Sequence, residues 1–157
     1  DCELTIYSGT AQWAFEKSGI AGPNIRISQV PYDRVIEALR QHDILLLPHG
    51  FERGLSDPEF ATIFPTRTVS YLVAGRPILA HSPPHAFLTQ WLRENNCAEI
   101  VDEKSPERLS LALDKLIADP QRRTELVRNA AVAARQFRPA EVTGILRREL
   151  TVRSAAE

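Results

Sequence analysis

Three residues with anion-binding chemistry stand close together in this chain: Thr66, Arg67 and Ser70. Pro65 precedes them, and proline is favoured in the first turn of a helix because it has no N–H group to leave unpaired. We therefore predict that a helix begins here, with the Thr66 hydroxyl as its cap. Free N–H groups and the helix dipole attract anions at such a start, and a guanidinium donates to two oxygens at once. We expect Arg67 and the Thr66 N–H group to hold a diphosphate.

The same segment predicts how this helix packs and where it ends. Val69, Leu72 and Val73 are apolar at helical spacing, and Gly75 stands where a left-handed residue often closes a helix. The apolar run 78–80 predicts a short strand that is buried on both faces. The diphosphate site is thus expected beside a parallel sheet.

Strands alternate with helices along the rest of the chain. We predict strands at 4–7, 25–30, 43–48, 78–80 and 98–101. Further helices are predicted to end near residue 17, to begin at Asp33 with its side chain as the cap, and to cover 85–95. Later helices are predicted to begin at Ser105-Pro106, to run from Asp119-Pro120 to about 137, and to cover 140–150, and we expect a frayed tail at 151–157. This alternation indicates right-handed crossovers and an α/β fold, a Rossmann-like doubly wound parallel sheet flanked by helices.

Ligands of such sheets bind outside the carboxyl ends of the strands. The other loops expected at this edge contain Ser8, Gly9, Pro31, Tyr32, His49, Gly50 and Phe51. Gly50 lets the backbone approach a ligand closely, and the loop at Pro31-Tyr32 is expected to border a nucleotide base. The sequence therefore predicts one nucleotide pocket built from four loops, with no catalytic residue assigned.

Each of these residues also has a purely structural explanation. By composition alone Arg67 is a solvated helix charge, and only its surroundings favour phosphate contact. A lone histidine after a strand, such as His49, is more often structural than catalytic. Ser70 and Tyr32 each stay open between ligand contact and an ordinary role, which for Tyr32 is packing over its own loop.

Size, charge and residue types limit the classes of function. The chain has 157 residues and a formal net charge of −1, which gives no support for a nucleic-acid-binding surface. No apolar run approaches the roughly 20 residues that span a bilayer. The histidines, including His81 and His85, and the cysteines Cys2 and Cys97 lack companion ligands at metal spacing, so we predict no metal site and no cofactor. A cytoplasmic protein fits best, with peripheral membrane association left open.

The segment 64–80 resembles the second-domain signature of retaining glycosyltransferases of the GT-B type, in the group 1 or family 4-like class. The matching parts are Pro65-Thr66-Arg67, Ser70-Tyr71-Leu72 and Ala74-Gly75-Arg76-Pro77-Ile78. The likeness in element order extends from about Leu4 to Phe137, and only 64–80 is specific. It implies that residues 1–150 are a C-terminal donor-binding domain. Because Asp1-Cys2-Glu3 runs into a strand without an initiator methionine, we expect a longer protein whose N-terminal acceptor domain is missing here.

The resemblance implies a glycosyltransferase of hexosyl type. Its second domain is expected to bind the nucleoside diphosphate of a nucleotide-sugar donor, and this part alone is expected to be inactive. Many members carry two glutamates, the second of which contacts the ribose. Those positions are Thr62 and Ser70 here, and the family's lysine is Arg67. A neutral serine bonds a ribose hydroxyl more weakly than a carboxylate does.

Two other functions stay open. Sugar-nucleotide epimerases have the same two-domain architecture, and product analysis separates epimerised from transferred sugar. The missing glutamates also fit a degenerate, non-catalytic domain that binds a partner or scaffolds an assembly. Failure to bind any common nucleotide-sugar donor would favour that last function.

Overall fold

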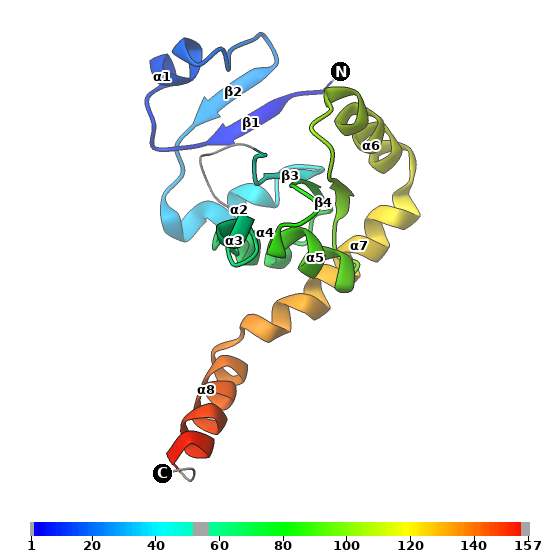
Figure 1. Cartoon of the computed structure of the whole chain (residues 1–157). Helices are drawn as coiled ribbons and strands as arrows, with labels where there is room; N and C mark the ends of the chain where they lie inside the picture. Colours follow the sequence, from blue (N-terminus) through cyan, green and yellow to red (C-terminus); the bar gives the residue numbers. More distant parts are fainter. Residues whose placement is uncertain (1, 52–56, 155–157) are drawn as a thin grey trace.

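The computed structural model describes residues 2–51 and 57–154, and it confirms an α/β fold with parallel strands flanked by helices (Figure 1). The strands described are β1 (Leu4–Tyr7), β2 (Ile25–Ser28), β3 (Leu45–Pro48), β4 (Ile78–His81) and β5 (Glu99–Val101). Hydrogen bonds join them in two parallel groups, β1-β2 and β3-β4-β5, where the sequence predicted one continuous sheet. Strand positions were thus predictable, while the pairing between β1 and the later strands was not.

The helices connect these strands in the order expected of an alternating fold. They are α1 (Gln12–Lys17), α2 (Val35–Leu39), α3 (Asp57–Phe60), α4 (Arg67–Ala74), α5 (Phe87–Glu94), α6 (Pro106–Ala118), α7 (Pro120–Ala133) and α8 (Pro139–Ser154), with 3-10 turns η1 (Tyr32–Arg34) and η2 (Ala134–Phe137). Residues 151–154 continue α8, and residues 155–157 lie outside the described part. The expected fraying of the tail at 151–157 stays a prediction.

The core lies on both faces of β4, as its apolar run predicted. Ile78 and Ala80 are fully buried with Leu72 of α4 and Leu92 of α5 on one side. Leu79 points the other way, into a cluster with residues of β5, α6 and α7. Successive strand residues alternate between faces, so a strand that is covered on both sides needs no polar position.

Two predicted caps are wrong, and both lie where the backbone is already helical or turned. Thr66 has φ −57° and ψ −31° and makes no side-chain cap bond. The N–H groups of Thr68 and Val69 instead bond to the carbonyls of Pro65 and Thr66, so a tight turn begins α4. Asp33 lies inside η1, and neither η1 nor α2 has a side-chain cap. A capping oxygen needs an extended backbone to reach the N–H groups of the next turn.

Three other helix boundaries follow the sequence signals. Gly75 ends α4 with φ +72°, the left-handed conformation that favours glycine. Ser105 begins α6 by accepting a hydrogen bond from the Arg108 N–H group. Asp119 begins α7 in the same way, with Arg122 N as donor at 2.8 Å. In contrast, Val73 of the predicted apolar stripe is 39% exposed, and Thr68 and Ala74 are the residues buried beside Leu72.

The first two strands and α1 form a unit without a core of its own, and none of residues 4–28 is buried. Figure 1 shows β1 and β2, in blue, as a ribbon pair set apart from β3 and β4. Tyr7, the last residue of β1, packs on the cluster of Leu39, Leu45 and Ala74, and its hydroxyl is 2.7 Å from His42 Nε2. The carboxyl end of β1 therefore meets the beginning of β3.

Candidate functional site

The candidate site is the edge where β3 and β4 end. His49 follows β3, is buried, and donates its N–H to the His81 carbonyl at 2.9 Å. The next residue, Gly50, has φ +78°. A side chain is rarely tolerated at that angle, so glycine permits the backbone to turn sharply away from the strand end here. The segment predicted to line a pocket thus bends directly over the carboxyl edge of the sheet.

Arg67 is fixed at the same edge, although it belongs to the start of α4. Its Nη2 donates a 2.6 Å hydrogen bond to the carbonyl oxygen of Pro48, the last residue of β3. Apart from this hydrogen bond, the Arg67 side chain is exposed to solvent. One hydrogen bond therefore holds the guanidinium in place while the rest of its planar fork faces solvent, an arrangement suited to an incoming anion.

Rings from three segments surround this edge. Phe51 lies 4.7 Å from the ring of His81, measured between centroids. Phe60 of α3 lies edge-on between His49, at 5.6 Å, and His85, at 5.5 Å. The His81 Nε2 is 2.9 Å from the Glu103 carbonyl, which only accepts, so this nitrogen carries a proton. The edge therefore combines aromatic faces with a fixed cation.

Sequence reasoning missed Phe60, His81 and His85 as neighbours of this site. One signal was available for His81, because it ends β4 and the carboxyl ends of adjacent parallel strands meet at one edge. The positions of Phe60 and His85 depend on how two loops fold back over the sheet, which no local spacing specifies.

The structure does not bring the loop at Ser8 and Gly9 to this edge. Ser8 and Gly9 follow Tyr7, which contacts the amino end of β3 instead. The Ser8 hydroxyl accepts a hydrogen bond from Thr10 N at 3.0 Å and so closes its own turn. Of the expected loops, those at 49–51 and 65–70 come together at this edge, where Arg67 Nη2 donates to the Pro48 carbonyl. Among the described strands β1 pairs only with β2, so no hydrogen-bond ladder holds the end of β1 beside the end of β3.

The loop at Pro31 and Tyr32 is open to solvent. Tyr32 is 97% exposed, so its ring does not pack over its own loop, one of the two roles left open for it. Pro31 is exposed as well and precedes η1 with an extended backbone. Contact of this loop with a nucleotide base stays a prediction.

The remaining residues of the motif divide between surface and core. Thr66 is exposed and Ser70 is half-buried. Tyr71 packs against the core, and burial raises the pKa of its phenol above the ordinary value of 10.0, while the nearby Arg67 charge opposes this shift. Tyr71 is therefore a neutral packing residue under Arg67. Thr62 donates to the carbonyls of Pro58 and Glu59 at the end of α3.

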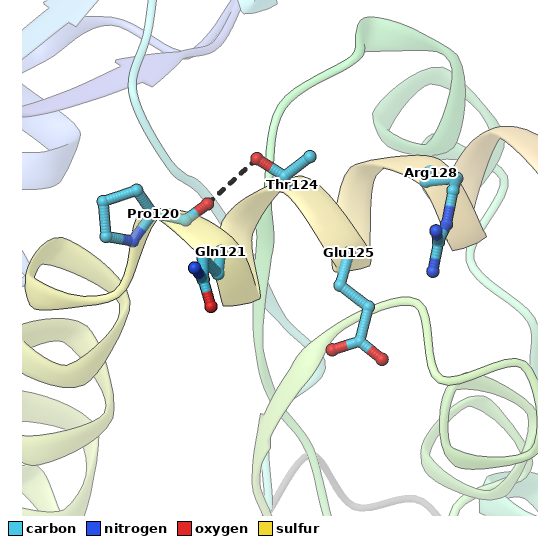
Figure 2. A pocket seen from close by; sticks show the side chains of 5 residues that line it. All are labelled: Pro120, Gln121, Thr124, Glu125 and Arg128. Carbon is cyan, nitrogen blue, oxygen red and sulfur yellow. Dashed lines mark hydrogen bonds between the residues drawn. The ribbon is translucent and has the colours of Figure 1, made fainter.

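Two surface hollows are lined by residues other than those of the candidate site. A shallow one of about 340 Å³ runs along α7, lined by Pro120, Gln121, Thr124, Glu125 and Arg128. Figure 2 shows Gln121, Glu125 and Arg128 extending to one side of the helix, while Thr124 bonds back to the Pro120 carbonyl at 2.9 Å.

The second hollow, of about 310 Å³, lies between β5 and the outer face of α6, and Asp102, Glu103, Arg108 and Lys115 help to line it. Its charges are paired within the fold: Asp102 with Arg93, Glu103 with Arg108, and Lys115 with Glu99. Because opposite charges already balance there, this hollow offers no fixed excess charge to a ligand, unlike the edge at Arg67.

Over residues 2–51 and 57–154, no three His, Cys, Asp or Glu side chains gather closely enough to hold a metal ion. In the same part of the chain, no helix combines the length and apolarity needed to cross a bilayer. No family model matches this chain, and no curated protein matches its sequence.

Proposed function

We propose that this chain binds the nucleoside diphosphate of a sugar donor at the edge between β3 and α4, as the donor-binding part of a glycosyltransferase. The observation that carries the proposal is the hydrogen bond between Arg67 Nη2 and the Pro48 carbonyl. An arginine that is already held in place loses less side-chain freedom when it binds a phosphate, and its remaining N–H groups suit two oxygens at once.

The surroundings of Arg67 support an anionic ligand of this size. The guanidinium stands at the first residue of α4, where the helix dipole adds positive potential. Gly50 turns the backbone with φ +78° just after β3, and the Phe51 and His81 rings, 4.7 Å apart between centroids, supply flat surfaces at this edge. A diphosphate carries negative charge on two phosphoryl groups joined by an oxygen. The guanidinium can bind one group while the free N–H groups at the start of the helix bind the other, so this site suits a diphosphate better than it suits a single carboxylate.

The test is a titration of the chain with UDP, GDP, ADP and the corresponding nucleotide sugars, in which ligand-observed NMR measures binding. We expect one diphosphate to bind saturably, and Arg67→Ala to weaken it about 10- to 100-fold, as for the loss of a charge-assisted hydrogen bond. The affinity of Arg67→Lys should lie between those of the parent chain and Arg67→Ala, because lysine keeps the positive charge but lacks the planar guanidinium that donates to two oxygens.

Arg26→Ala is the matched control, since Arg26 is an exposed arginine on β2 that pairs with Glu3. It removes the same charge far from the proposed site and should leave affinity unchanged. A urea unfolding curve for each variant shows whether the fold is kept. If a folded Arg67→Ala variant bound the diphosphate as tightly as the parent chain, the proposed phosphate contact of Arg67 would be refuted.

We propose a binding-only domain as the second candidate, and Thr62 is the residue that favours it. Its hydroxyl is bonded to the Pro58 and Glu59 carbonyls, so it is occupied within α3 where many glycosyltransferases of this type carry a glutamate. Saturable nucleotide binding with no sugar transfer or epimerisation, in a longer chain that includes an acceptor domain, would support this candidate.

A further inference from the structure

β5 has one edge that no described strand covers, because it is the last strand in the order β3-β4-β5. The Val101 carbonyl accepts a hydrogen bond from the N–H of Ser82, the residue after β4, so the backbone polar groups of Val101 point toward β4. The N–H and C=O groups of successive residues in an extended strand point to opposite edges. Those of Ile100 therefore point outward, where they offer one donor and one acceptor to another extended chain.

The hollow between β5 and α6 follows this edge. It has a volume of about 310 Å³ and touches Ile100 and Val101 together with α6, and none of its described lining residues belongs to β4. The Val101 side chain packs on the α6 side of the sheet, whereas that of Ile100 packs into the cluster on the other side. A hollow that reaches both residues and α6 thus lies beside the outer edge of the strand. We call it the β5 groove, between β5 and the α6 residues Arg108, Leu111, Ala112 and Lys115.

The lining of the β5 groove indicates the chemistry of its ligand. Leu111 gives the groove an aliphatic side chain that is 61% exposed. The charged groups are balanced within the fold, Glu103 by Arg108 and Lys115 by Glu99. A nucleic acid would need an excess of basic groups, which this lining lacks. The ligand therefore needs backbone-like hydrogen-bonding groups and an apolar group, and it needs no net charge.

We propose that the β5 groove binds an extended peptide segment of a partner protein, which adds as a strand to the outer edge of β5. The Ile100 N–H donates to a peptide carbonyl, the Ile100 carbonyl accepts from a peptide N–H, and an uncharged peptide side chain lies against Leu111. An extended peptide supplies all three groups, because donors and acceptors repeat along its edge and alternate side chains point to the α6 side. The site does not depend on the nucleotide-binding function proposed for the edge at Arg67.

The proposed interaction is weak. β5 has three residues, so only Ile100 presents its N–H and C=O groups to the added strand. A few main-chain hydrogen bonds and one apolar contact correspond to a Kd on the order of 100 μM. Affinity of this order is measurable by titration of the chain.

The experiment begins with a selection from a displayed library of random octapeptides against the whole 157-residue chain. The library is first depleted on the Leu111→Glu variant, in which a charge stands in the groove. We expect an enriched peptide to bind Leu111→Glu about tenfold or more weakly than it binds the parent chain. Ile117→Glu is the matched control, because Ile117 is an exposed aliphatic residue of α6 outside the groove lining. It adds the same charge to the same helix and should leave affinity unchanged, and a urea unfolding curve shows that each variant is folded.

Amide NMR of the isotope-labelled chain, saturated with the enriched peptide, tests the strand addition. Hydrogen exchange at the Ile100 N–H should slow by on the order of tenfold, whereas exchange at Val101, whose N–H already faces β4, should stay the same. A form of the same peptide with every backbone nitrogen methylated keeps the side chains and loses the donors. It should bind about tenfold or more weakly, since the Ile100 carbonyl then has no donor.

Four results would overturn the proposal. The first is a selection in which no peptide is enriched over the depleted library. The second is an enriched peptide that leaves exchange at Ile100 unchanged, which would place its site elsewhere. The third is equal affinity of the methylated peptide, which would mean that side chains alone are bound. The fourth is slow exchange at Ile100 that depends on the concentration of the chain without any peptide, which would make a second copy the occupant of this edge.

Discussion

Cys97 gives a prediction whose size follows directly from its surroundings. The side chain is 1% exposed and belongs to the core cluster with Leu88 and Leu92, just before β5. Burial raises the pKa of the Cys97 thiol from an ordinary value near 9 to about 12, against a weaker opposing effect of a backbone hydrogen bond. The folded protein therefore keeps a proton on this sulfur over a pH range in which the unfolded chain releases it.

The sign of the effect on stability follows from the protons bound. Between about pH 9 and pH 12 the folded state binds more protons than the unfolded state, so the free energy of unfolding falls as the pH rises. At about pH 10, a thiol of pKa near 9 in the unfolded chain is mostly ionised, which costs the folded state about 1.4 kcal/mol relative to neutral pH.

The assay is urea unfolding at about pH 7.5 and about pH 10 for the parent chain and for Cys97→Ala. Both carry Cys2→Ser, because Cys2 is exposed and would form disulfides between molecules. Tyrosine ionisation affects both proteins alike and cancels in the difference between them. We expect the advantage of the parent over Cys97→Ala to shrink by about 1.4 kcal/mol on going to the higher pH. A difference that stays constant with pH would refute the reasoning.

Three further predictions concern the fold that carries the site. Leu72→Ala should lower the free energy of unfolding by about 2–5 kcal/mol, because Leu72 is 1% exposed, while Val73→Ala should cost less than about 1 kcal/mol; equal losses would mean that the faces of α4 are assigned wrongly. Gly75→Ala should cost about 1–2 kcal/mol in the same assay because of its φ of +72°, although the added Cβ meets no atom within 4 Å; an unchanged midpoint would show that the left-handed turn is not needed. Hydrogen exchange should be on the order of 100-fold faster in the β1-β2 ladder than in β3-β4, since no residue of 4–28 is buried, and similar protection of both would argue against a separately opening unit.

Local signals predicted most of the elements, because each depends on a few neighbouring residues. Ser105-Pro106 and Asp119-Pro120 fixed the starts of α6 and α7 through a capping oxygen and a proline that needs no hydrogen-bond acceptor. Gly75 marked the end of α4 through its backbone freedom. Thr66 misled, because the same Pro-Thr pair also permits a tight turn in which no hydroxyl is required.

Long-range placement was harder to predict. The alternation of strands and helices indicates parallel strands but does not state which strand lies beside β1. Tyr7 decides this in the structure, since its ring packs at the amino end of β3 and its hydroxyl meets His42. The sequence did predict that Arg67 lies at the edge where β3 ends, where its side chain bonds to the Pro48 carbonyl. It could not predict that Tyr7 would hold the neighbouring Ser8 at the amino end of β3 instead.

The parallel pairing of β1 with β2 also decides how this unit responds to force. If the chain is pulled from Leu4 at one end and from the body of the fold at the other, the load enters at the start of β1 and leaves at the end of β2, Ser28. In a parallel pair these two points lie at opposite ends of the ladder. The rungs are then loaded together, in shear, rather than opened one at a time. A unit in which no residue of 4–28 is fully buried thus has a mechanically resistant attachment to the rest of the molecule.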